Sequence, residues 1–273
     1  LAALPWSYRN EGDSMAKTTQ QRRNEIYRII VSQGSARVSE LAEQLQVTTE
    51  TIRKDLNSMD EQGIIIKNHG GAEIKNTYYQ LPLDVKMSEH VYEKQLIARR
   101  ALDFIQDNTV LFLDPGSTIL YLAKYLRLRK GLTVVTNSLA IASMVSETTH
   151  QLMIAGGLLQ KQGKAAIGGF TNSMIDAIHI DTAFMGCDGF LDSFGPATFS
   201  HEEMEVKQHV LRKAQQRILL CDSSKFRKSS SYTFARWSDY DVLITDQITE
   251  QEQHMVKEVR QLICVSEEDY EFI

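Results

Sequence analysis

The sequence predicts an α/β protein with two domains: a small one of three helices and a β-hairpin, and a larger one with a mainly parallel sheet between helical layers. Within the first 75 residues, three short helical patterns precede two short strands. From about residue 93, short apolar runs alternate with helical segments. We expect a tail at 1–17, the first domain at 18–75, a linker at 76–92 and the second domain at 93–273.

The composition is that of an ordinary soluble globular protein, with 42% hydrophobic and 24% charged residues. No apolar run approaches the roughly 18 residues needed to cross a bilayer. The opening LAALPW lacks the basic start of an export signal. The three cysteines, Cys187, Cys221 and Cys264, are odd in number and unevenly spaced, which indicates free thiols in a reducing compartment. We therefore expect a cytoplasmic protein that uses no metal, no cofactor and no membrane.

The formal net charge of the chain is −5, which does not by itself favour a nucleic-acid partner. Basic and acidic residues balance within the first 75 residues, so the negative charge belongs to the remainder of the chain. This asymmetry is weak, and any binding of nucleic acid must depend on where the charges are placed.

Three segments near the N-terminus carry apolar residues at the three- and four-residue spacing of a helix. Their apolar faces are Ile26, Ile29 and Ile30; then Leu41, Ala42 and Leu45; then Ile52, Leu56 and Met59. The second and third helices have hydroxyl side chains, Ser39 and Thr48, at their expected N-caps. Gly34 and Gly63 end the first and third helices. Few residues separate the second helix from Thr48, so the turn between these helices is tight.

A β-hairpin is predicted after the third helix. Residues 64–67 have the composition of a strand, 68–71 form a turn with two glycines, and 72–74 return as the partner strand. Three helices with a tight turn before the third, followed by a hairpin, make a winged helix-turn-helix, which is a DNA-binding motif.

The third helix leaves hydroxyl and basic side chains on its exposed side. Such groups suit base edges and phosphates in a major groove, and the positive N-terminus of the helix attracts phosphate. We expect double-stranded operator DNA to contact Thr48, Thr49, Thr51, Arg53, Lys54, Asn57 and, from the hairpin, His69. Two plainer interpretations stay open: that this face of the helix is simply solvated, and that His69 is an exposed turn residue.

The stretch SELAEQLQVTTETIRKDLNSMDEQGIIIKNHGGA resembles the N-terminal signature of the DeoR family of bacterial transcriptional regulators. That signature is a recognition helix, V-S-x-x-T-I-R-[RK]-D-L, followed by a wing, G-x-[IL]-x-R-x-H-G-G-A. The residues from Thr51 to Leu56 and from His69 to Ala72 keep the pattern. Thr48 stands where Ser is usual and Lys67 where Arg is usual, and both departures conserve the hydroxyl cap or the charge.

The second half of the chain alternates strands with helices. After the linker, residues 93–105 have a helical pattern. Short apolar runs then predict strands at 110–114, 132–137, 152–157, 182–187, 217–222, 241–246 and 262–266. Helical patterns lie between most of them, at 119–126, 138–145, 172–180, 201–215 and 250–261. Such continuously apolar strands predict a mainly parallel sheet covered on both faces.

Small and polar residues gather where five of these strands end, at 114–118, 136–138, 156–157, 186–189 and 222–225. Ligands of such sheets bind beyond the carboxyl ends of the strands. The 116–118 turn offers N–H and hydroxyl groups to an anion, while Asp188 or Asn137 suits hydroxyl groups. The alternatives are a plain capped turn and solvated lysines.

The motifs DPGST, VVTNSL, AGGLL, TAFMGCDGF and LLCDSSKF resemble the C-terminal sensor domain of the same family. The resemblance implies a fold similar to ribose-phosphate isomerases and glucosamine-phosphate deaminases, and a phosphorylated sugar as effector. It places the effector site at Asp114, Gly116, Ser117, Thr118, Thr136, Asn137, Ser138, Gly157, Gly186, Asp188, Gly189 and Lys225, and less closely at Glu203 and Lys207 of an E-x-x-x-K pattern.

We therefore expect a transcriptional regulator and no enzyme: a repressor of a carbohydrate-utilisation operon that responds to a phosphorylated sugar. The alternative is a sugar-phosphate isomerase or deaminase with an accessory DNA-binding domain. The deaminases place a histidine soon after a G-x-D-G turn, where this chain has Phe190 and Leu191, although Asp188 and Glu203 remain as possible proton carriers. A homo-oligomer, dimer or tetramer, suits paired half-sites. The 76–91 segment is expected to transmit the effector response.

Overall fold

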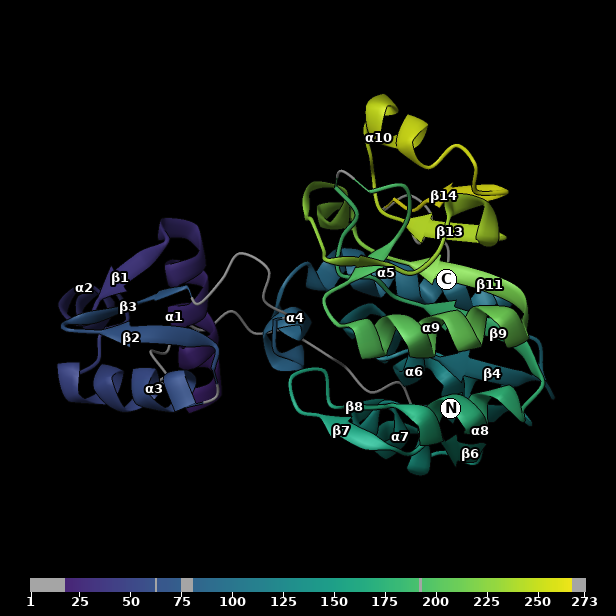
Figure 1. Cartoon of the computed structure of the whole chain (residues 1–273), viewed down its shortest axis with the longest axis horizontal. Coiled ribbons are helices and arrows are strands. Elements are labelled where there is room, and N and C mark those ends of the chain that lie inside the picture. The colour runs from purple at the N-terminus through teal and green to yellow at the C-terminus, as the bar shows by residue number, and fades with distance from the viewer. Residues whose placement is uncertain (1–17, 62, 75–80, 192, 267–273) are drawn as a thin grey trace, which may run out of the picture. The chain divides into compact units, whose positions relative to one another are not determined.

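The computed structural model describes residues 18–61, 63–74, 81–191 and 193–266. The chain divides after Thr77 into two compact units, which are described separately here (Figure 1). The expected tail at 1–17 lies outside the described residues.

The first unit contains three helices and a three-stranded antiparallel sheet. Its elements are α1 (Thr19–Gln33), β1 (Ser35–Arg37), α2 (Val38–Gln44), α3 (Thr49–Glu61), β2 (Ile65–Asn68) and β3 (Gly71–Ile74). The sheet order is β1-β3-β2. Ile26, Leu41, Ile52 and Leu56 are fully buried between the helices. The predicted winged helix-turn-helix is confirmed, and β1 is an additional strand that the sequence analysis did not anticipate.

The ends of the helices agree with expectation except at α2. The Thr48 hydroxyl accepts a hydrogen bond from the Thr51 N–H at 3.2 Å, as an N-cap should. The predicted cap at Ser39 is wrong, because β1 runs directly into α2 and places Arg37 at the N-cap. There the Arg37 N–H donates to Glu40 Oε2 at 3.2 Å, so Glu40 satisfies the helix start.

The wing lies close against the start of α2. Gly71 is the one residue type that fits at its position, because a Cβ there would lie 2.3 Å from the Ala36 carbonyl oxygen. Its neighbour Gly70 has φ +103°, a region that favours glycine. The Gly70 carbonyl accepts a hydrogen bond from the Val38 N–H at 2.8 Å. The two glycines therefore hold the wing against the helices.

The second unit is built on a seven-stranded parallel sheet of order β14-β13-β11-β9-β4-β5-β6. Its strands are β4 (Val110–Leu113), β5 (Thr133–Thr136), β6 (Gln151–Ile154), β9 (Ile180–Met185), β11 (Ala214–Leu220), β13 (Val242–Thr245) and β14 (Gln261–Cys264). Two small antiparallel pairs are separate from it: the hairpin of β7 (Leu158–Gln160) with β8 (Ala165–Ile167), and β10 (Ala197–Thr198) with β12 (Tyr232–Thr233). The mainly parallel sheet is confirmed, and these two pairs are additional strands that were not predicted.

Helices cover both faces of this sheet (Figure 1). They are α4 (Leu83–Ser88), α5 (Val91–Ala101), α6 (Ser117–Tyr125), α7 (Leu139–Ser146), α8 (Gly169–Asp176), α9 (His201–Lys213) and α10 (Glu250–Met255), with short 3-10 turns η1 (Leu102–Phe104), η2 (Leu126–Leu128), η3 (Ser223–Arg227) and η4 (Trp237–Asp239). Leu111 and Leu113 of β4 pack into the core under α5, α6 and α7. Phe112 points the other way, into the core under α8 and α9. This alternation is that of a sheet buried on both sides.

The expected linker at 76–92 differs from the structure, because α4 lies within it and packs on the second unit. Leu83 and Val85 are buried, and the Leu83 N–H donates to the Gln162 carbonyl at 3.2 Å. The Tyr121 hydroxyl donates to the Met87 carbonyl at 3.1 Å. A helix of six residues is too short to show a periodic pattern, so it could not be predicted from the sequence.

Within the described ranges, no helix is both long enough and apolar enough to span a bilayer.

Candidate functional site

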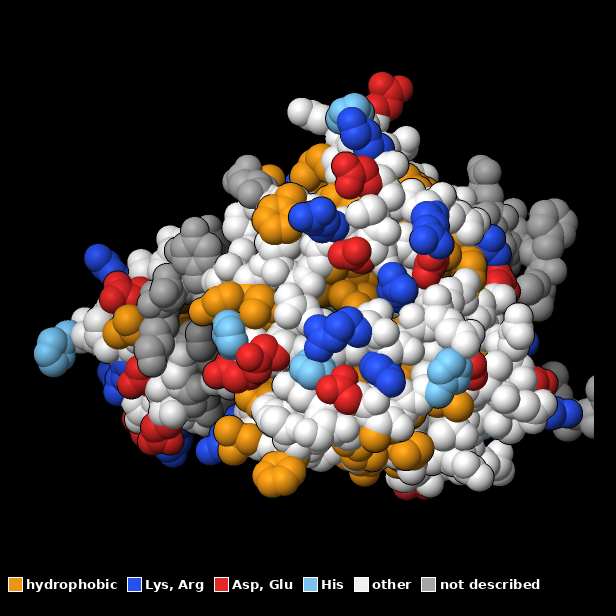
Figure 2. Space-filling model, turned by 45° about the vertical axis from the view of Figure 1, so that its right-hand side comes forward, with side chains coloured by type: hydrophobic (Ala, Val, Ile, Leu, Met, Phe, Trp, Pro, Cys, Tyr) orange, Lys and Arg blue, Asp and Glu red, His pale blue; other side chains and the backbone are white. Residues whose placement is uncertain are grey.

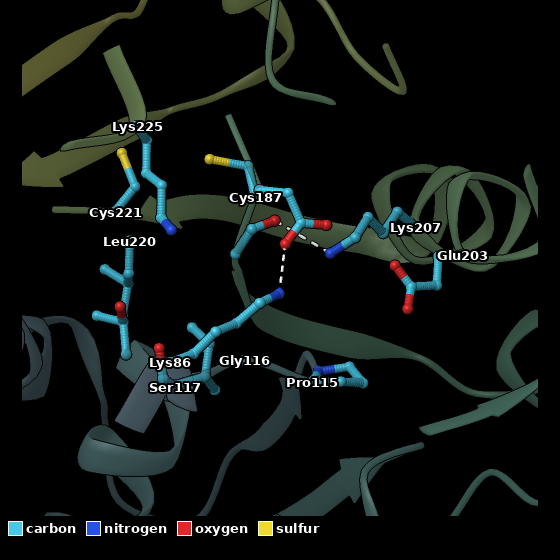
Figure 3. Close-up of a pocket in the computed structure, with 14 residues that line it drawn as sticks. Lys86, Pro115, Gly116, Ser117, Cys187, Glu203, Lys207, Leu220, Cys221 and Lys225 are labelled. Atoms are coloured by element: carbon cyan, nitrogen blue, oxygen red, sulfur yellow. Dashed lines mark hydrogen bonds and ion pairs between the residues drawn. The ribbon is translucent and has the colours of Figure 1, made fainter. Parts of the chain in front are cut away.

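A pocket lies at the carboxyl ends of β4, β9 and β11, the three central strands of the large sheet (Figure 3). Because these strands are parallel neighbours, the residues that follow them meet in one place. The space between these residues, including the part that is open to solvent, is about 460 Å³. The lining is formed by Lys86, Pro115, Gly116, Ser117, Thr118, Ile119, Gly186, Cys187, Asp188, Glu203, Lys207, Leu220, Cys221 and Lys225.

Lys207 and Asp114 form a buried ion pair at the back of the pocket. The Lys207 ammonium group contacts Asp114 Oδ2 and also donates to the Gly186 carbonyl at 3.0 Å. The Gly186 N–H donates to Asp114 Oδ2 at 2.9 Å. Burial raises the pKa of Asp114. Burial also opposes the charge of Lys207, but the Asp114 carboxylate outweighs it and raises the pKa of Lys207. The pair therefore fixes α9 to the end of β4.

A second ion pair joins α4 to the turn after β9. Lys86 Nζ lies 2.5 Å from Asp188 Oδ1. Burial alone would raise the pKa of Asp188, but the Lys86 ammonium and two neighbouring lysines outweigh burial and lower it to about 2. The Thr198 hydroxyl lies 3.1 Å from Asp188 Oδ2 and 2.5 Å from Glu203 Oε2. Its single proton is therefore shared between two carboxylates.

Lys94, which is 1% exposed, holds the backbone of α4 through two hydrogen bonds. Its amine donates to the carbonyl oxygens of Lys86 at 2.5 Å and of Glu89 at 2.6 Å. Burial lowers the pKa of Lys94 to about 8. These hydrogen bonds satisfy carbonyl groups at the end of α4 that have no partner within the helix.

Lys225 is the third lysine of the pocket, and it differs from the other two. Its side chain is 9% exposed, and Figure 3 shows its amine end pointing into the pocket. Within the described part of the chain, its ammonium group has no hydrogen-bond or ion-pair partner. Burial opposes its charge, but the nearby carboxylates of Asp222 and Asp188 raise its pKa, so it stays protonated. The pocket therefore contains a cation that is available to an anionic ligand.

The start of α6 forms the opposite wall. Gly116 is its N-cap, and the buried residues Ser117 and Thr118 form its first turn. The first N–H groups of a helix have no partner within the helix, and they attract anions. A Cβ at Gly116 would meet nothing closer than 3.8 Å, so this position is open towards the pocket. A helix start and a free ammonium group together suit a phosphate.

The structure brings together most of the residues predicted for an effector site. Those that line the pocket are Gly116, Ser117, Thr118, Gly186, Asp188, Glu203, Lys207 and Lys225. Asp114 lies directly behind them, bonded to Lys207. The separate carboxyl ends of β4, β9 and β11 thus converge as the parallel arrangement predicted.

Five predicted residues do not line the pocket: four lie at or just after the ends of β5 and β6, which are beyond β4 in the sheet, and Gly189 packs against Lys228. Thr136 donates to the Leu113 carbonyl at 2.7 Å, Asn137 donates to the Ala166 carbonyl at 2.8 Å, and Ser138 caps α7. Gly157 and Gly189 lie where the chain packs closely. A Cβ at Gly157 would lie 2.3 Å from Thr171 Oγ1, and a Cβ at Gly189 would lie 2.1 Å from the Lys228 carbonyl oxygen. Their contacts are structural.

The sequence analysis missed Lys86 and Cys187 as lining residues. Lys86 lay in the expected linker, where no periodic pattern placed it near the strand ends. Cys187 was treated as a buried thiol of a strand, and it is half-buried beside the buried Cys221. Its position between Gly186 and Asp188, in a predicted site turn, was the available signal.

In the first unit, α3 presents its polar face to solvent. Thr49, Arg53 and Lys54 are exposed. Glu50 lies 4.0 Å from both Arg53 and Lys54, and such exposed contacts are worth little. The two basic side chains are therefore free to bind another anion.

Other residues predicted to contact DNA connect α3 with its surroundings. Thr48 and Thr51 share a hydroxyl–hydroxyl hydrogen bond of 2.9 Å. Asn57 Oδ1 accepts a hydrogen bond from Lys67 Nζ at 2.5 Å, which links α3 to the wing. His69 is exposed at the turn between β2 and β3.

The position of α3 is set by Asp55, which is 2% exposed. Its two carboxylate oxygens accept hydrogen bonds from Arg22 Nε at 2.6 Å and Arg23 Nε at 2.9 Å. Both arginines belong to α1. This buried cluster fixes the angle between the two helices.

A winged helix-turn-helix followed by an α/β domain is the architecture of a transcriptional regulator. Residues 22–78 match the family described as DeoR-like helix-turn-helix domain, and residues 89–247 match the DeoR C terminal sensor domain. The chain belongs to the DeoR family. The resemblance expected from the sequence is thus confirmed.

Curated relatives match over most of their length. The lactose phosphotransferase system repressor of Staphylococcus epidermidis is 30% identical, over 82% of this chain and 91% of that protein. The glycerol-3-phosphate regulon repressor of Escherichia coli K12 is 31% identical, over 83% and 90%. The HTH-type transcriptional regulator IolR of Bacillus subtilis is 31% identical, over 82% and 89%.

Solved structures match more weakly and only in part. A D-ribose-5-phosphate isomerase in complex with phospho-erythronic acid has a TM-score of 0.37 and 21% identity, covering 48% of this chain and 52% of that one. The eIF2B beta subunit of Chaetomium thermophilum has a TM-score of 0.40 and 12% identity, covering 81% and 63%.

Proposed function

We propose that this protein is a cytoplasmic repressor of a carbohydrate-utilisation operon, and that a phosphorylated sugar in the α/β pocket controls its binding to operator DNA. It acts as a homo-oligomer and catalyses no reaction. The names of its relatives, which include repressors of a lactose phosphotransferase system and of a glycerol-3-phosphate regulon, support a role in carbohydrate metabolism.

The observation that carries the effector proposal is the unpaired ammonium group of Lys225, which shares the pocket with the N-terminus of α6. A phosphate bound there would accept hydrogen bonds from N–H groups near Ser117 and Thr118 and pair with Lys225. The carboxylates of Asp188 and Glu203 would then accept hydrogen bonds from sugar hydroxyl groups.

On the DNA side, Thr49, Arg53 and Lys54 are the proposed contacts in the major groove. Arg53 would contact a guanine edge, and Lys54 would contact a phosphate. Thr48 and Thr51 would position the helix start against the backbone. Asn57 and His69 would extend the contact towards the wing.

The contacts of the pocket favour binding over catalysis. Where the deaminases place a histidine, Phe190 is fully buried and packs edge-on against Phe226 and Trp237, with ring centroids 4.7 and 4.8 Å away. Asp114 and Asp188 each pair with a lysine, and Glu203 accepts a hydrogen bond from Thr198. Paired carboxylates are poorly suited to abstract a proton.

The response of DNA binding to effector would pass through α4. This helix follows the winged helix-turn-helix in the chain, and its Lys86 reaches into the effector pocket. An anion in the pocket competes with Asp188 for Lys86, so bound and free states differ in the contacts of α4. A ligand shifts a conformational equilibrium only through such a difference.

Fluorescence anisotropy of the full chain on its own upstream DNA tests this proposal, with a panel of sugar phosphates added at fixed salt. Salt is held constant because phosphate contacts make every DNA affinity salt-dependent. We expect specific binding that one sugar phosphate shifts at least tenfold, while its unphosphorylated sugar and inorganic phosphate do not. Specific DNA binding that no sugar phosphate alters would contradict the effector assignment. Conversion of a sugar phosphate in the same mixtures would contradict the absence of catalysis.

A further inference from the structure

An uncharged apolar surface lies at the β6 edge of the large sheet, and neither proposed site uses it. Its large side chains come from β6, β7 and the first residues of α7 and α8: Met153, Ile154, Leu158, Leu159, Leu139 and Phe170. Phe170 is 86% exposed and Leu158 is 74% exposed. Figure 2 shows hydrophobic side chains gathered along the lower rim of the face in view, at the level where Figure 1 places β7 and α8. These six residues are called the β6-edge patch below.

Hydrogen bonds connect the elements that carry the patch. The Thr171 hydroxyl at the start of α8 donates to the Gly156 carbonyl, between β6 and β7, at 3.1 Å. The Leu139 N–H donates to the Lys164 carbonyl next to β8 at 2.9 Å. Because β8 pairs with β7, these hydrogen bonds connect the elements of the patch at the β6 edge of the sheet.

The sequence around the patch is free of charge. Residues 151–160 and 165–175 contain no Lys, Arg, Asp or Glu. Two lysines lie between these stretches: Lys161 is exposed at the turn between β7 and β8, and Lys164 is paired with Asp84 of the same chain at 3.0 Å. Exposed sheet edges normally carry charged residues that prevent association. Here that protection is missing at β6, the last strand of the sheet.

We propose that the β6-edge patch binds the same patch of a second copy of this chain, around a two-fold axis. In such a contact each surface meets itself, so an uncharged surface avoids the opposition of like charges that a charged one would create. The six side chains expose on the order of 600 Å², at or above the largest patch on a typical monomer. With its polar rim, this approaches the roughly 800 Å² per partner of a stable interface.

This inference rests on the proposed homo-oligomer and adds the place of its interface. Sedimentation velocity of the full chain tests it, with wild type compared with Phe170→Asp and Leu158→Asp. The control is Phe194→Asp, since Phe194 is 70% exposed in the loop between β9 and β10, outside the patch. We expect wild type and the control to form dimers or larger species, and both patch variants to raise the dissociation constant at least 100-fold while the subunit stays folded.

Each other outcome has a distinct meaning. A monomeric wild type overturns this inference and the homo-oligomer together. An oligomer that both patch variants leave intact overturns only the interface, so the homo-oligomer stands. Amide hydrogen exchange of the wild-type protein, compared at high and low protein concentration, tests the same interface without substitutions. Assembly should protect amides of 151–160 and 165–175, and protection confined to other segments overturns the inference.

Discussion

Lys86 Nζ and Asp188 Oδ1 lie 2.5 Å apart, although 102 residues separate them in the sequence. The lysine comes from the first helix of the α/β unit and the aspartate from the turn after a central strand. Both side chains line the same pocket. A ligand that binds in the pocket must therefore leave this ion pair intact or break it.

Lys86→Met should separate the effector response from DNA binding. The substitution removes the cation for which effector and Asp188 compete, so the affinity for operator DNA should no longer change when the sugar phosphate is added. Binding without effector should stay within about threefold of wild type. Anisotropy titrations with and without effector measure both quantities. Lys161→Met, at an exposed lysine outside the pocket lining, is the matched control. A normal response in Lys86→Met would exclude α4 as the transmitter through this lysine.

Lys225→Met should weaken the binding of the effector. Loss of a charge-assisted hydrogen bond costs roughly 1.5–3 kcal/mol, so we expect the dissociation constant to rise about 10- to 150-fold by titration calorimetry. The free protein should lose some stability, because Asp222 and Asp188 raise the pKa of Lys225 and lose its nearby positive charge in the variant. Lys257→Met, an exposed lysine of the same unit, controls for lost charge. Equal affinities in all three proteins would remove Lys225 from the site.

Arg53→Ala should weaken specific DNA binding far more than non-specific binding. A bidentate contact to a base is worth about 1–3 kcal/mol, which corresponds to a roughly 5- to 150-fold loss on the operator. Competition titrations with operator and scrambled DNA at one salt concentration give the two losses. Arg127→Ala removes the same charge from an exposed position in the α/β unit. Equal losses on both DNAs would mean that Arg53 contacts phosphate only.

Asp55→Ala should loosen α3 without touching its exposed face. Removing one partner of a buried ion pair leaves the other charges uncompensated, and we expect a cost of about 3 kcal/mol to the first unit. Amides of α1 and α3 should then exchange with solvent roughly 100-fold faster, and operator affinity should fall. Glu61→Ala, at the exposed end of α3, is the control. Unchanged exchange rates would show that Asp55 does not hold these helices together.

The ion pair of Asp188 makes the free energy of unfolding depend on pH in the acid range. Because its pKa is lowered to about 2 in the folded protein, the carboxylate contributes about 2 kcal/mol above its ordinary pKa near 4, and this contribution is lost as the pH falls towards 2. In Lys86→Met the pKa should rise, so the difference in free energy of unfolding from wild type should shrink between pH 4 and pH 2.5. Urea unfolding across that range measures it. A difference independent of pH would contradict the assigned pKa.

Much of this molecule follows from sequence because its signals are local. The third helix could be predicted from Thr48, Ile52 and Leu56, since a cap and an apolar face lie within one segment. The pocket residues could be predicted because strand ends in a parallel sheet share an edge. The order of the strands in the sheet depends on tertiary packing and not on local sequence. The sequence therefore could not show that Asp188 lines the pocket while Asn137 lies outside it, beyond β4.

The short elements of the fold were not predicted, for a related reason. The six residues of α4 and the three of β1 hold too few side chains to show a period. Lys86 was missed with them, although it contacts a residue that the sequence analysis did name. Its placement depends on Leu83 and Val85 packing on the sheet domain, which is a tertiary effect.

Lys94 gives α4 an anchor that does not depend on charge. With a pKa of about 8, its amine exchanges a proton with solvent within the range in which many bacteria grow. A neutral amine still has two N–H groups, and two carbonyl oxygens receive them, those of Lys86 and Glu89. The same two hydrogen bonds can therefore hold the end of α4 whether Lys94 is charged or neutral.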